Sequence, residues 1–292
     1  MNGPKSASLP IAVTMGDPAG VGPLLVALAR AQEKSRHIPG FVFLGDGTSA
    51  APGVPDTANA KAIIKSIEDA VRMAVNGKAR AVVTNPIHKK SLMDSGFKHK
   101  GHTGFLGELT GATPVMMLAN DELKVVPVTG HVALKDAIKL ITVERIVETA
   151  EIVARDLEGR FGIHKPRMAF TGLNPHAGEE GALGNEEIKT IIPAIKMLQA
   201  KGYQAQGPFP ADSAYTAAMR MKFDVFLAMT HDQALTPVKT LDYRKTVNIT
   251  LGLPIVRTSP AHGTAFDLVK AGDAPDPESF IQALLWAERL SQ

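Results

Sequence analysis

The chain has 292 residues, enough for a large hydrophobic core and for two lobes. Its mean hydropathy is +0.02, and no apolar run approaches the ~20 residues that cross a bilayer, which favours a soluble globular protein over a membrane protein. The chain contains no cysteine, which excludes disulfides, thiolate nucleophiles and zinc sites built on sulfur. Any metal would therefore be held by His, Asp or Glu.

The net charge of +3 is too dispersed to indicate nucleic-acid binding. Aromatic residues make up 5% of the chain, so no platform for stacking bases is indicated. A mildly basic balance suits a small anionic substrate equally well. The first ten residues lack the hydrophobic stretch of a signal peptide, which favours a cytoplasmic location.

Strand and helix patterns alternate along the chain, which predicts a doubly wound α/β fold. No repeat, low-complexity tract or flexible linker separates the segments, so two lobes are expected to share a cleft. A hairpin is expected around residues 120–122. The strands are predicted at residues 9–14, 41–44, 81–84, 115–119, 123–128, 168–171, 225–229, 247–250 and 255–258, and the main helices at 24–31, 58–76, 143–161, 186–201 and 277–290.

Three histidines each follow a short apolar run that ends in a turn: His131, His176 and His231. Side chains at the carboxyl ends of strands converge on one edge of an α/β sheet, where ligands usually bind. Three neutral imidazoles meeting there would hold Zn²⁺ and leave a position open for a substrate oxygen. Each histidine taken alone is equally consistent with an ordinary loop or core residue.

Two turns at predicted helix starts are suited to binding an anion. The turn at residues 16–23 has three glycines between a strand and a helix, although it matches neither the dinucleotide fingerprint nor a P-loop. His102 and Thr103 precede an amphipathic segment, with Thr103 as the expected N-cap. Packing alone explains the glycines, and capping alone explains Thr103.

Four further polar residues stand in apolar surroundings and are candidates for catalysis or anion binding. Asp212 is expected at or near a helix N-cap, and Lys239, eight residues after His231, could take part in proton transfer. Asn248 and Arg257 lie on predicted short strands, where a guanidinium needs a protein carboxylate or an anionic ligand. Capping for Asp212 and a solvated stem for Lys239 remain alternatives.

The turn after the last predicted strand could contact a nucleotide. It contains His262, Gly263, Thr264 and Asp267, and the carboxylate of Asp267 could accept hydrogen bonds from ribose hydroxyls.

Taken in order, these motifs resemble the 4-hydroxythreonine-4-phosphate dehydrogenase family of vitamin B6 biosynthesis. The resemblance extends over essentially the whole chain, and the set of motifs in this order is highly specific. The matching segments are residues 15–23, 84–89, 101–103, 131–136, 172–179, 210–212, 231–233, 247–254, 257–259 and 262–265.

The resemblance implies a two-lobed α/β/α fold similar to the isocitrate and isopropylmalate dehydrogenases, with the active site in the cleft between the lobes. Residues 1–103 with 263–292 would form the first lobe. Residues 104–262 would form the second, with most metal and substrate residues and the interface of a homodimer that shares its active sites. The enzyme would oxidise 4-phosphohydroxy-L-threonine with NAD or NADP and decarboxylate the product to 3-amino-2-oxopropyl phosphate.

The family's site residues map onto the candidates found above. His131, His176 and His231 would hold a divalent metal, Zn²⁺ or else Mg²⁺ or Co²⁺. Lys239 or Asp212 would move the proton. The substrate would contact His102, Thr103, Asp212, Lys239, Asn248 and Arg257, and the cosubstrate would contact His262, Gly263, Thr264 and Asp267.

The chain departs from the family at three places, all outside the mapped metal and anion residues. Leu24 and Gly104 stand where acidic residues are usual, and the segment between Gly47 and Ala58 is short, so an edge strand or arm is expected to be missing. A dehydrogenase of threonate or erythronate 4-phosphate, and a metal-dependent lyase or hydrolase without nicotinamide, are the alternatives. The pair His102 and Thr103 favours a phosphorylated substrate over the aromatic dihydrodiol of other relatives.

Overall fold

The structure is a computed structural model that describes residues 9–45 and 50–292. The chain divides into two compact units, each with its own part of a β-sheet. Unit 1 comprises residues 1–114 and 247–292, and unit 2 comprises residues 115–246. The sequence predicted the same discontinuous arrangement but placed the boundaries after residues 103 and 262.

The sheet of unit 1 explains why its second segment starts at Val247. β9 and β10 form an antiparallel pair, and β10 also pairs with β3, so both strands belong to this sheet. The strand order is β2-β1-β3-β10-β9, and all pairs except β10 with β9 are parallel. The strands are β1 (Ile11–Thr14), β2 (Phe41–Leu44), β3 (Ala81–Val83), β9 (Val247–Leu251) and β10 (Arg257–Pro260).

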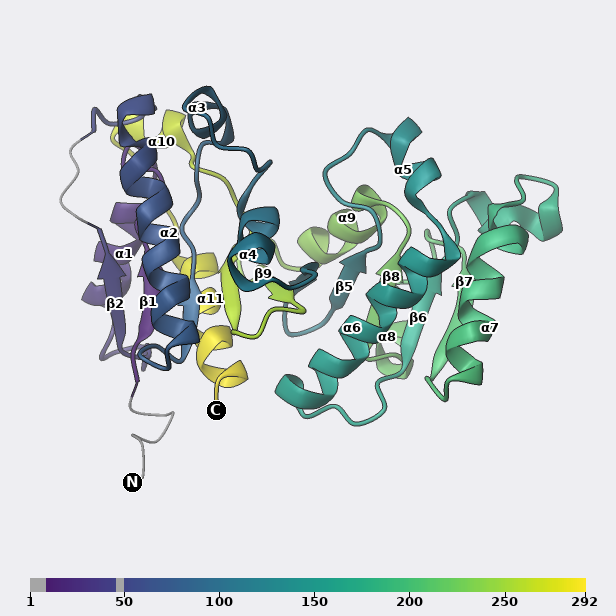
Figure 1. Cartoon of the computed structure of the whole chain (residues 1–292). Helices are drawn as coiled ribbons and strands as arrows, with labels where there is room; N and C mark the ends of the chain where they lie inside the picture. The colour runs from purple at the N-terminus through teal and green to yellow at the C-terminus, as the bar shows by residue number, and fades with distance from the viewer. Residues whose placement is uncertain (1–8, 46–49) are drawn as a thin grey trace. The chain divides into compact units, whose positions relative to one another are not determined.

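Helices cover both faces of this sheet (Figure 1). The chain moves outward from β1 to β2 and then back to β3, and right-handed crossovers in opposite directions place α1 and α2 on opposite faces. α11 packs beside α1, while Phe105 and Leu106 of α4 join α2 in one buried cluster. The helices are α1 (Gly22–Ala31), η2 (Thr57–Asn59), α2 (Ala60–Val75), α3 (Lys89–Asp94), α4 (His102–Thr110), α10 (Phe266–Ala271) and α11 (Glu278–Leu290).

Unit 2 has a second, mostly parallel set of strands. β4 and β5 form the predicted antiparallel hairpin, and β5, β8, β6 and β7 follow in parallel. β7 escaped prediction because Gly207 and Pro208 interrupt its pattern. The strands are β4 (Val115–Ala119), β5 (Lys124–Pro127), β6 (Met168–Thr171), β7 (Ala205–Phe209) and β8 (Val225–Ala228).

The helices of unit 2 flank this sheet (Figure 1). α6 matches its predicted bounds because Thr142 caps it by accepting a hydrogen bond from the Arg145 amide, and Gly162 ends it with φ +66°. The predicted helix at residues 186–201 divides into a π-helical turn, η4 (Glu187–Ile191), and α7 (Ile192–Ala200). The others are α5 (Leu134–Leu140), α6 (Val143–Phe161), η3 (Pro175–Gly181), α8 (Ala217–Lys222) and α9 (His231–Leu241).

The alternating strands and helices confirm the predicted α/β class. Within the ranges that the structure describes, none of the helices combines the length and apolar character needed to cross a membrane. The predictions on the first eight residues and on residues 46–49 lie outside the described ranges.

Candidate functional site

The three predicted histidine ligands follow three neighbouring parallel strands of unit 2. His131 comes four residues after β5, His231 begins α9 just after β8, and His176 lies in the turn that follows β6. Since β5 pairs with β8 and β8 pairs with β6, all three chain segments leave the sheet at the same edge. These three residues are called the histidine edge below.

Two members of the histidine edge are neighbours in space. The ring centroids of His131 and His231 lie 5.3 Å apart. Nδ1 of His231 lies 2.7 Å from Oδ1 of Asp232, and this contact orients the ring with its Nε2 atom as the available ligand. A histidine held through one nitrogen by a carboxylate is typical of metal sites.

His176 is not brought into a ligand set with the other two. Among residues 9–45 and 50–292, no three His, Asp or Glu side chains are grouped as ligands for a metal ion. The strand order and the His131–His231 pair fit a metal site in part, since two imidazoles are adjacent and the third leaves the same edge. The three-histidine site therefore stays a prediction.

The two predicted proton-transfer residues also belong to unit 2. Asp212 is exposed in the turn after β7, at the edge from which the histidines leave. It is not the N-cap of the next helix, because α8 begins at Ala217 with Thr216 as its cap. Lys239 lies on α9 with its ammonium 5.5 Å from the centre of the Tyr243 ring. Eight residues at 1.5 Å each place its Cα about 12 Å from that of His231 along the helix.

Unit 1 contains a buried cationic site around Arg257. This residue is 2% exposed, and its guanidinium donates to the hydroxyls of Thr250 at 2.8 Å and Thr84 at 2.5 Å. In the part of the chain that the structure describes, the Nε atom of Arg257 is buried without a hydrogen-bond partner. Burial lowers the pKa of Arg257 to about 9. A buried guanidinium that bonds only to hydroxyls is suited to an anionic ligand.

His102 and Asn248 lie near this guanidinium. Register pairs Arg257 with Thr250 and Ser259 with Asn248, so Asn248 and Arg257 share one face of the β9–β10 pair. Burial, and then the charges of Arg257 and Lys89, hold the pKa of His102 well below its ordinary 6.5. Among residues 9–45 and 50–292, Oδ1 of Asn248 and Nε2 of His102 are buried without a hydrogen-bond partner. His102, Asn248 and Arg257 are called the anion cluster below.

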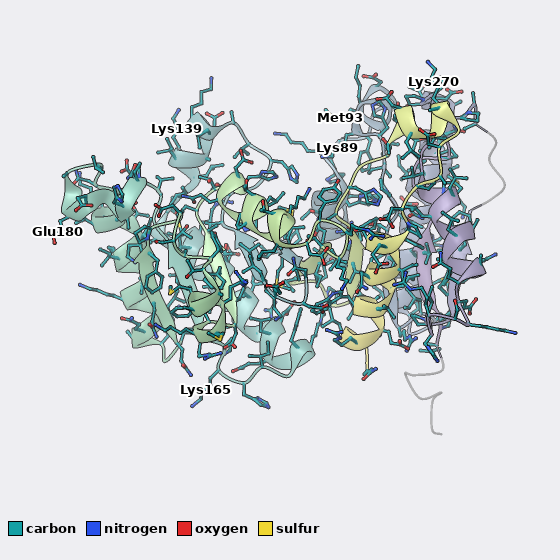
Figure 2. All side chains as sticks on the ribbon, turned by 180° about the vertical axis from the view of Figure 1, so that it is seen from behind. Lys89, Met93, Lys139, Lys165, Glu180 and Lys270 are labelled. Carbon is teal, nitrogen blue, oxygen red and sulfur yellow. The ribbon has the colours of Figure 1, made fainter. Side chains whose placement is uncertain are left out.

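The start of α4 adds further donors to the anion cluster. Thr103 is the second residue of α4 and not its N-cap, because Gly101 occupies the cap and the helix begins at His102. The amides of this first turn have no partner within the helix. The stem of Lys89 reaches the backbone beside Gly101, where a Cβ atom would lie 3.4 Å from Cε, and Figure 2 labels this lysine on α3.

The predicted cosubstrate turn, residues 262–267, packs on the glycine-rich turn after β1. The amide of Val21 donates to the Thr264 carbonyl at 3.0 Å, and a Cβ atom at Gly20 would lie 2.9 Å from that oxygen. The glycines therefore serve close backbone packing between two turns at the carboxyl edge of the sheet. Asp267 is exposed in the first turn of α10. Its contact with a cosubstrate stays a prediction.

Sequence reasoning missed the polar residues that support these sites. Thr84 and Thr250 accept hydrogen bonds from Arg257, and Gln233 and Glu187 bind the backbone of the turn that contains His176. Glu187 carried a signal: it occupies a helical face otherwise made of Ile191, Ala194, Ile195 and Leu198, all of them buried. A carboxylate at such a position needs buried hydrogen-bond donors.

Comparison with known proteins agrees with the resemblance read from the motifs. The family model described as pyridoxal phosphate biosynthetic protein PdxA matches residues 24–287. A 4-hydroxythreonine-4-phosphate dehydrogenase of Bradyrhizobium diazoefficiens is 42% identical over 338 residues, with 98% of each chain covered. The chain belongs to the PdxA family.

Solved structures of related proteins have the same fold. A 4-hydroxythreonine-4-phosphate dehydrogenase from Klebsiella pneumoniae is 33% identical with a TM-score of 0.84, covering 98% of this chain and 100% of that one. A terephthalate 1,2-cis-dihydrodiol dehydrogenase from Burkholderia xenovorans LB400 is 25% identical with a TM-score of 0.67, covering 96% and 98%. A PdxA-family member is a dehydrogenase of pyridoxal phosphate biosynthesis, and a dehydrogenase requires a hydride acceptor such as NAD or NADP.

Proposed function

We propose that this chain oxidises 4-phosphohydroxy-L-threonine and decarboxylates the product to 3-amino-2-oxopropyl phosphate, in the cytoplasm. The anion cluster carries the proposal. Arg257 is 2% exposed, and within the described ranges its guanidinium donates to two threonine hydroxyls and to no carboxylate. His102 and Asn248 add buried polar atoms that a phosphate or carboxylate would satisfy.

The residues divide the work of the reaction between binding and proton transfer. His102, Thr103, Asn248 and Arg257 bind the anionic ends of the substrate, and Lys239 joins them as a further cation. Lys239 or Asp212 accepts the proton of the C3 hydroxyl while the C3 hydride passes to the nicotinamide. The resulting β-keto acid loses CO₂, and the carbanion that remains takes up a proton. His262, Gly263, Thr264 and Asp267 would hold the cosubstrate.

A divalent metal fits the histidine edge in part, as described above. We propose that His131, His176 and His231 hold it, with Zn²⁺ as the first candidate because its usual ligands include imidazole. When bound, such an ion would supply Lewis acidity to substrate oxygens.

A single assay tests this function against its alternatives. The purified protein is mixed with NAD⁺, Zn²⁺ and 4-phosphohydroxy-L-threonine, and reduced nicotinamide and released CO₂ are both measured. Formation of both in equal amounts supports the proposal. Faster turnover of erythronate or threonate 4-phosphate would assign the related phosphorylated acid, and substrate cleavage without reduced nicotinamide would assign a lyase or hydrolase.

We further propose a homodimer in which each active site uses residues of both chains. Membership of the PdxA family supports this, because the family resemblance implies a homodimer with shared active sites. The H231A and K239A variants, each expected to be nearly inactive alone, are expected to recover part of the activity when mixed under conditions of subunit exchange. Mixtures that stay inactive although the chains exchange would indicate that each chain forms its own site.

A further inference from the structure

The turn that contains His176 has an unusual backbone. Five successive residues, 176–180, have positive φ values of 51°, 52°, 83°, 44° and 54°, and only Gly178 among them is a glycine. An L-residue in the left-handed region is strained, because its Cβ atom comes too close to the following carbonyl oxygen. Such a run persists only where surrounding groups hold it.

Glu187 binds the amides that lead into this turn. Its Oε1 accepts hydrogen bonds from the backbone amides of Leu173 and Asn174, both at 2.8 Å, and its Oε2 accepts from Asn174 Nδ2 at 2.9 Å. Glu187 is 2% exposed, and within the described ranges these three hydrogen-bond donors are all neutral. A buried carboxylate with three such donors fixes the position of the chain that supplies them.

The glycines of the turn leave room for this carboxylate. A Cβ atom at Gly178 would lie 2.5 Å from Oε2 of Glu187, and one at Gly172 would lie 3.1 Å from Oε1. The turn therefore closes around the carboxylate, with His176 between the two glycines in sequence.

Gln233 connects the same turn to the start of α9. Its Nε2 donates to the Gly172 carbonyl at 2.9 Å, while its Oε1 accepts from the Thr230 amide at 3.1 Å. Thr230 directly precedes His231, so one side chain spans the strand ends that carry His176 and His231. The turn is thus held on two sides, by Glu187 and by Gln233.

We propose that Glu187 is a positioning residue for metal binding: it holds the left-handed turn so that His176 can join His131 and His231 around a divalent cation. This inference rests on the proposed function, since it needs the three histidines to share one ion. The carboxylate itself does not touch the metal. Its part is to offset the cost of the strained backbone before the ion arrives.

The test measures Zn²⁺ affinity by competition with a chromophoric chelator, together with the melting temperature of the metal-free protein. In Glu187→Gln one acceptor oxygen becomes an amide donor, so a hydrogen bond to this turn is lost. We expect Zn²⁺ to bind at least tenfold more weakly, while the metal-free protein stays folded. Glu180→Gln is the matched control, because Glu180 is exposed in the same turn and Figure 2 shows it at the outer tip; its affinity is expected to equal that of the wild type.

Gly178→Ala disturbs the same contact at the turn, because its methyl group would clash with Oε2 of Glu187. We expect a similar loss of Zn²⁺ affinity. Zn²⁺ binding that falls in His176→Ala but stays at the wild-type level in both Glu187→Gln and Gly178→Ala would overturn the inference and leave the histidine site standing. Equal binding by the wild type and His176→Ala would refute the three-histidine site itself. If both Glu187→Gln and Gly178→Ala fail to fold, the carboxylate serves folding and the inference is wrong.

Discussion

The anion cluster and the histidine edge differ in how far their side chains are buried and fixed before a ligand binds. In the anion cluster, Arg257 is 2% exposed and fixed by two threonine hydroxyls, so folding itself has removed its water. In the histidine edge, His131 and His176 are exposed and His231 keeps 34% of its side-chain exposure. There the backbone turns are fixed, while the imidazoles themselves remain in contact with water.

This difference indicates how much ordering of side chains each ligand must bring about when it binds. A guanidinium already desolvated and oriented loses little further freedom when an anion arrives, which favours tight and specific recognition. Exposed imidazoles must still converge, and a metal ion supplies the energy for that step. Ligand affinity at the anion cluster should therefore depend mainly on electrostatics, and metal affinity at the histidine edge mainly on how well the three histidines are ordered.

The largest expected effect comes from the histidine edge. His231→Ala removes one ring of the His131–His231 pair, which lies at 5.3 Å. We expect kcat/KM to fall at least about 1000-fold and bound Zn²⁺ to be lost, because a metal site with one imidazole fewer no longer positions its ion. Metal analysis and steady-state kinetics measure both. His164→Ala is the control, because His164 is exposed in the loop after α6. Full metal occupancy in His231→Ala would show that His231 is not a metal ligand.

Arg257→Ala should have the next largest effect, on the anion cluster alone. We expect substrate binding to weaken by about 1.5–3 kcal/mol, the scale of a charge-assisted hydrogen bond. The melting temperature of the ligand-free protein should not fall steeply, since the variant also relieves the burial of a charge. Calorimetric titration and thermal melts measure the two quantities. A variant that binds substrate normally but melts far earlier would make Arg257 a structural residue.

The class of fold could be predicted because its signals are local. The apolar runs of β5, β6 and β8 and the helical spacing of α6 are visible without any tertiary information. The rule that parallel strands end at one edge then grouped His131, His176 and His231 correctly on that edge. The unit boundaries could not be read in the same way, because the pairing of β10 with β3 is a long-range contact.

Parts of the candidate sites depended on contacts that no local pattern shows. Asp212 was expected to cap a helix, but the amides of Ser213 and Ala214 bond to the Pro210 carbonyl and form a turn before α8 begins. Thr103 lies two residues after the actual cap, Gly101, which is within the usual shift of helix ends. Glu187 and Gln233 act on residues that are 13 to 14 and 61 positions away in sequence.

A smaller effect concerns the cosubstrate turn beside the glycine-rich turn of unit 1. NAD⁺ should be preferred over NADP⁺ by about tenfold, because the carboxylate of Asp267 accepts hydrogen bonds from ribose hydroxyls and repels a 2′-phosphate. Comparing kcat/KM for the two cosubstrates measures the preference. Asp267→Asn should reduce it, with Asp273→Asn as the control on the segment after α10. A tenfold preference for NADP⁺ would show that the turn is wrongly assigned.

The smallest predicted effect is a pH dependence of stability and of anion binding, which arises from His102 in the anion cluster. Burial and the charges of Arg257 and Lys89 hold its pKa well below 6.5 in the free protein, so the unfolded chain binds more protons between that folded pKa and 6.5. The ligand-free protein must therefore lose stability as the pH falls below 6.5.

A bound dianion reverses this balance, because it stabilises the imidazolium and raises the pKa of His102. Binding then takes up a proton, so the affinity for sulfate, which remains a dianion across this range, should rise about threefold as the pH falls from neutral to weakly acidic. Isothermal titration at several pH values measures the slope, and His102→Gln should flatten it while keeping sulfate binding through Arg257. If the wild type and His102→Gln show the same slope, the imidazole does not face the anion, and the anion cluster reduces to Arg257 and its neighbours on β9.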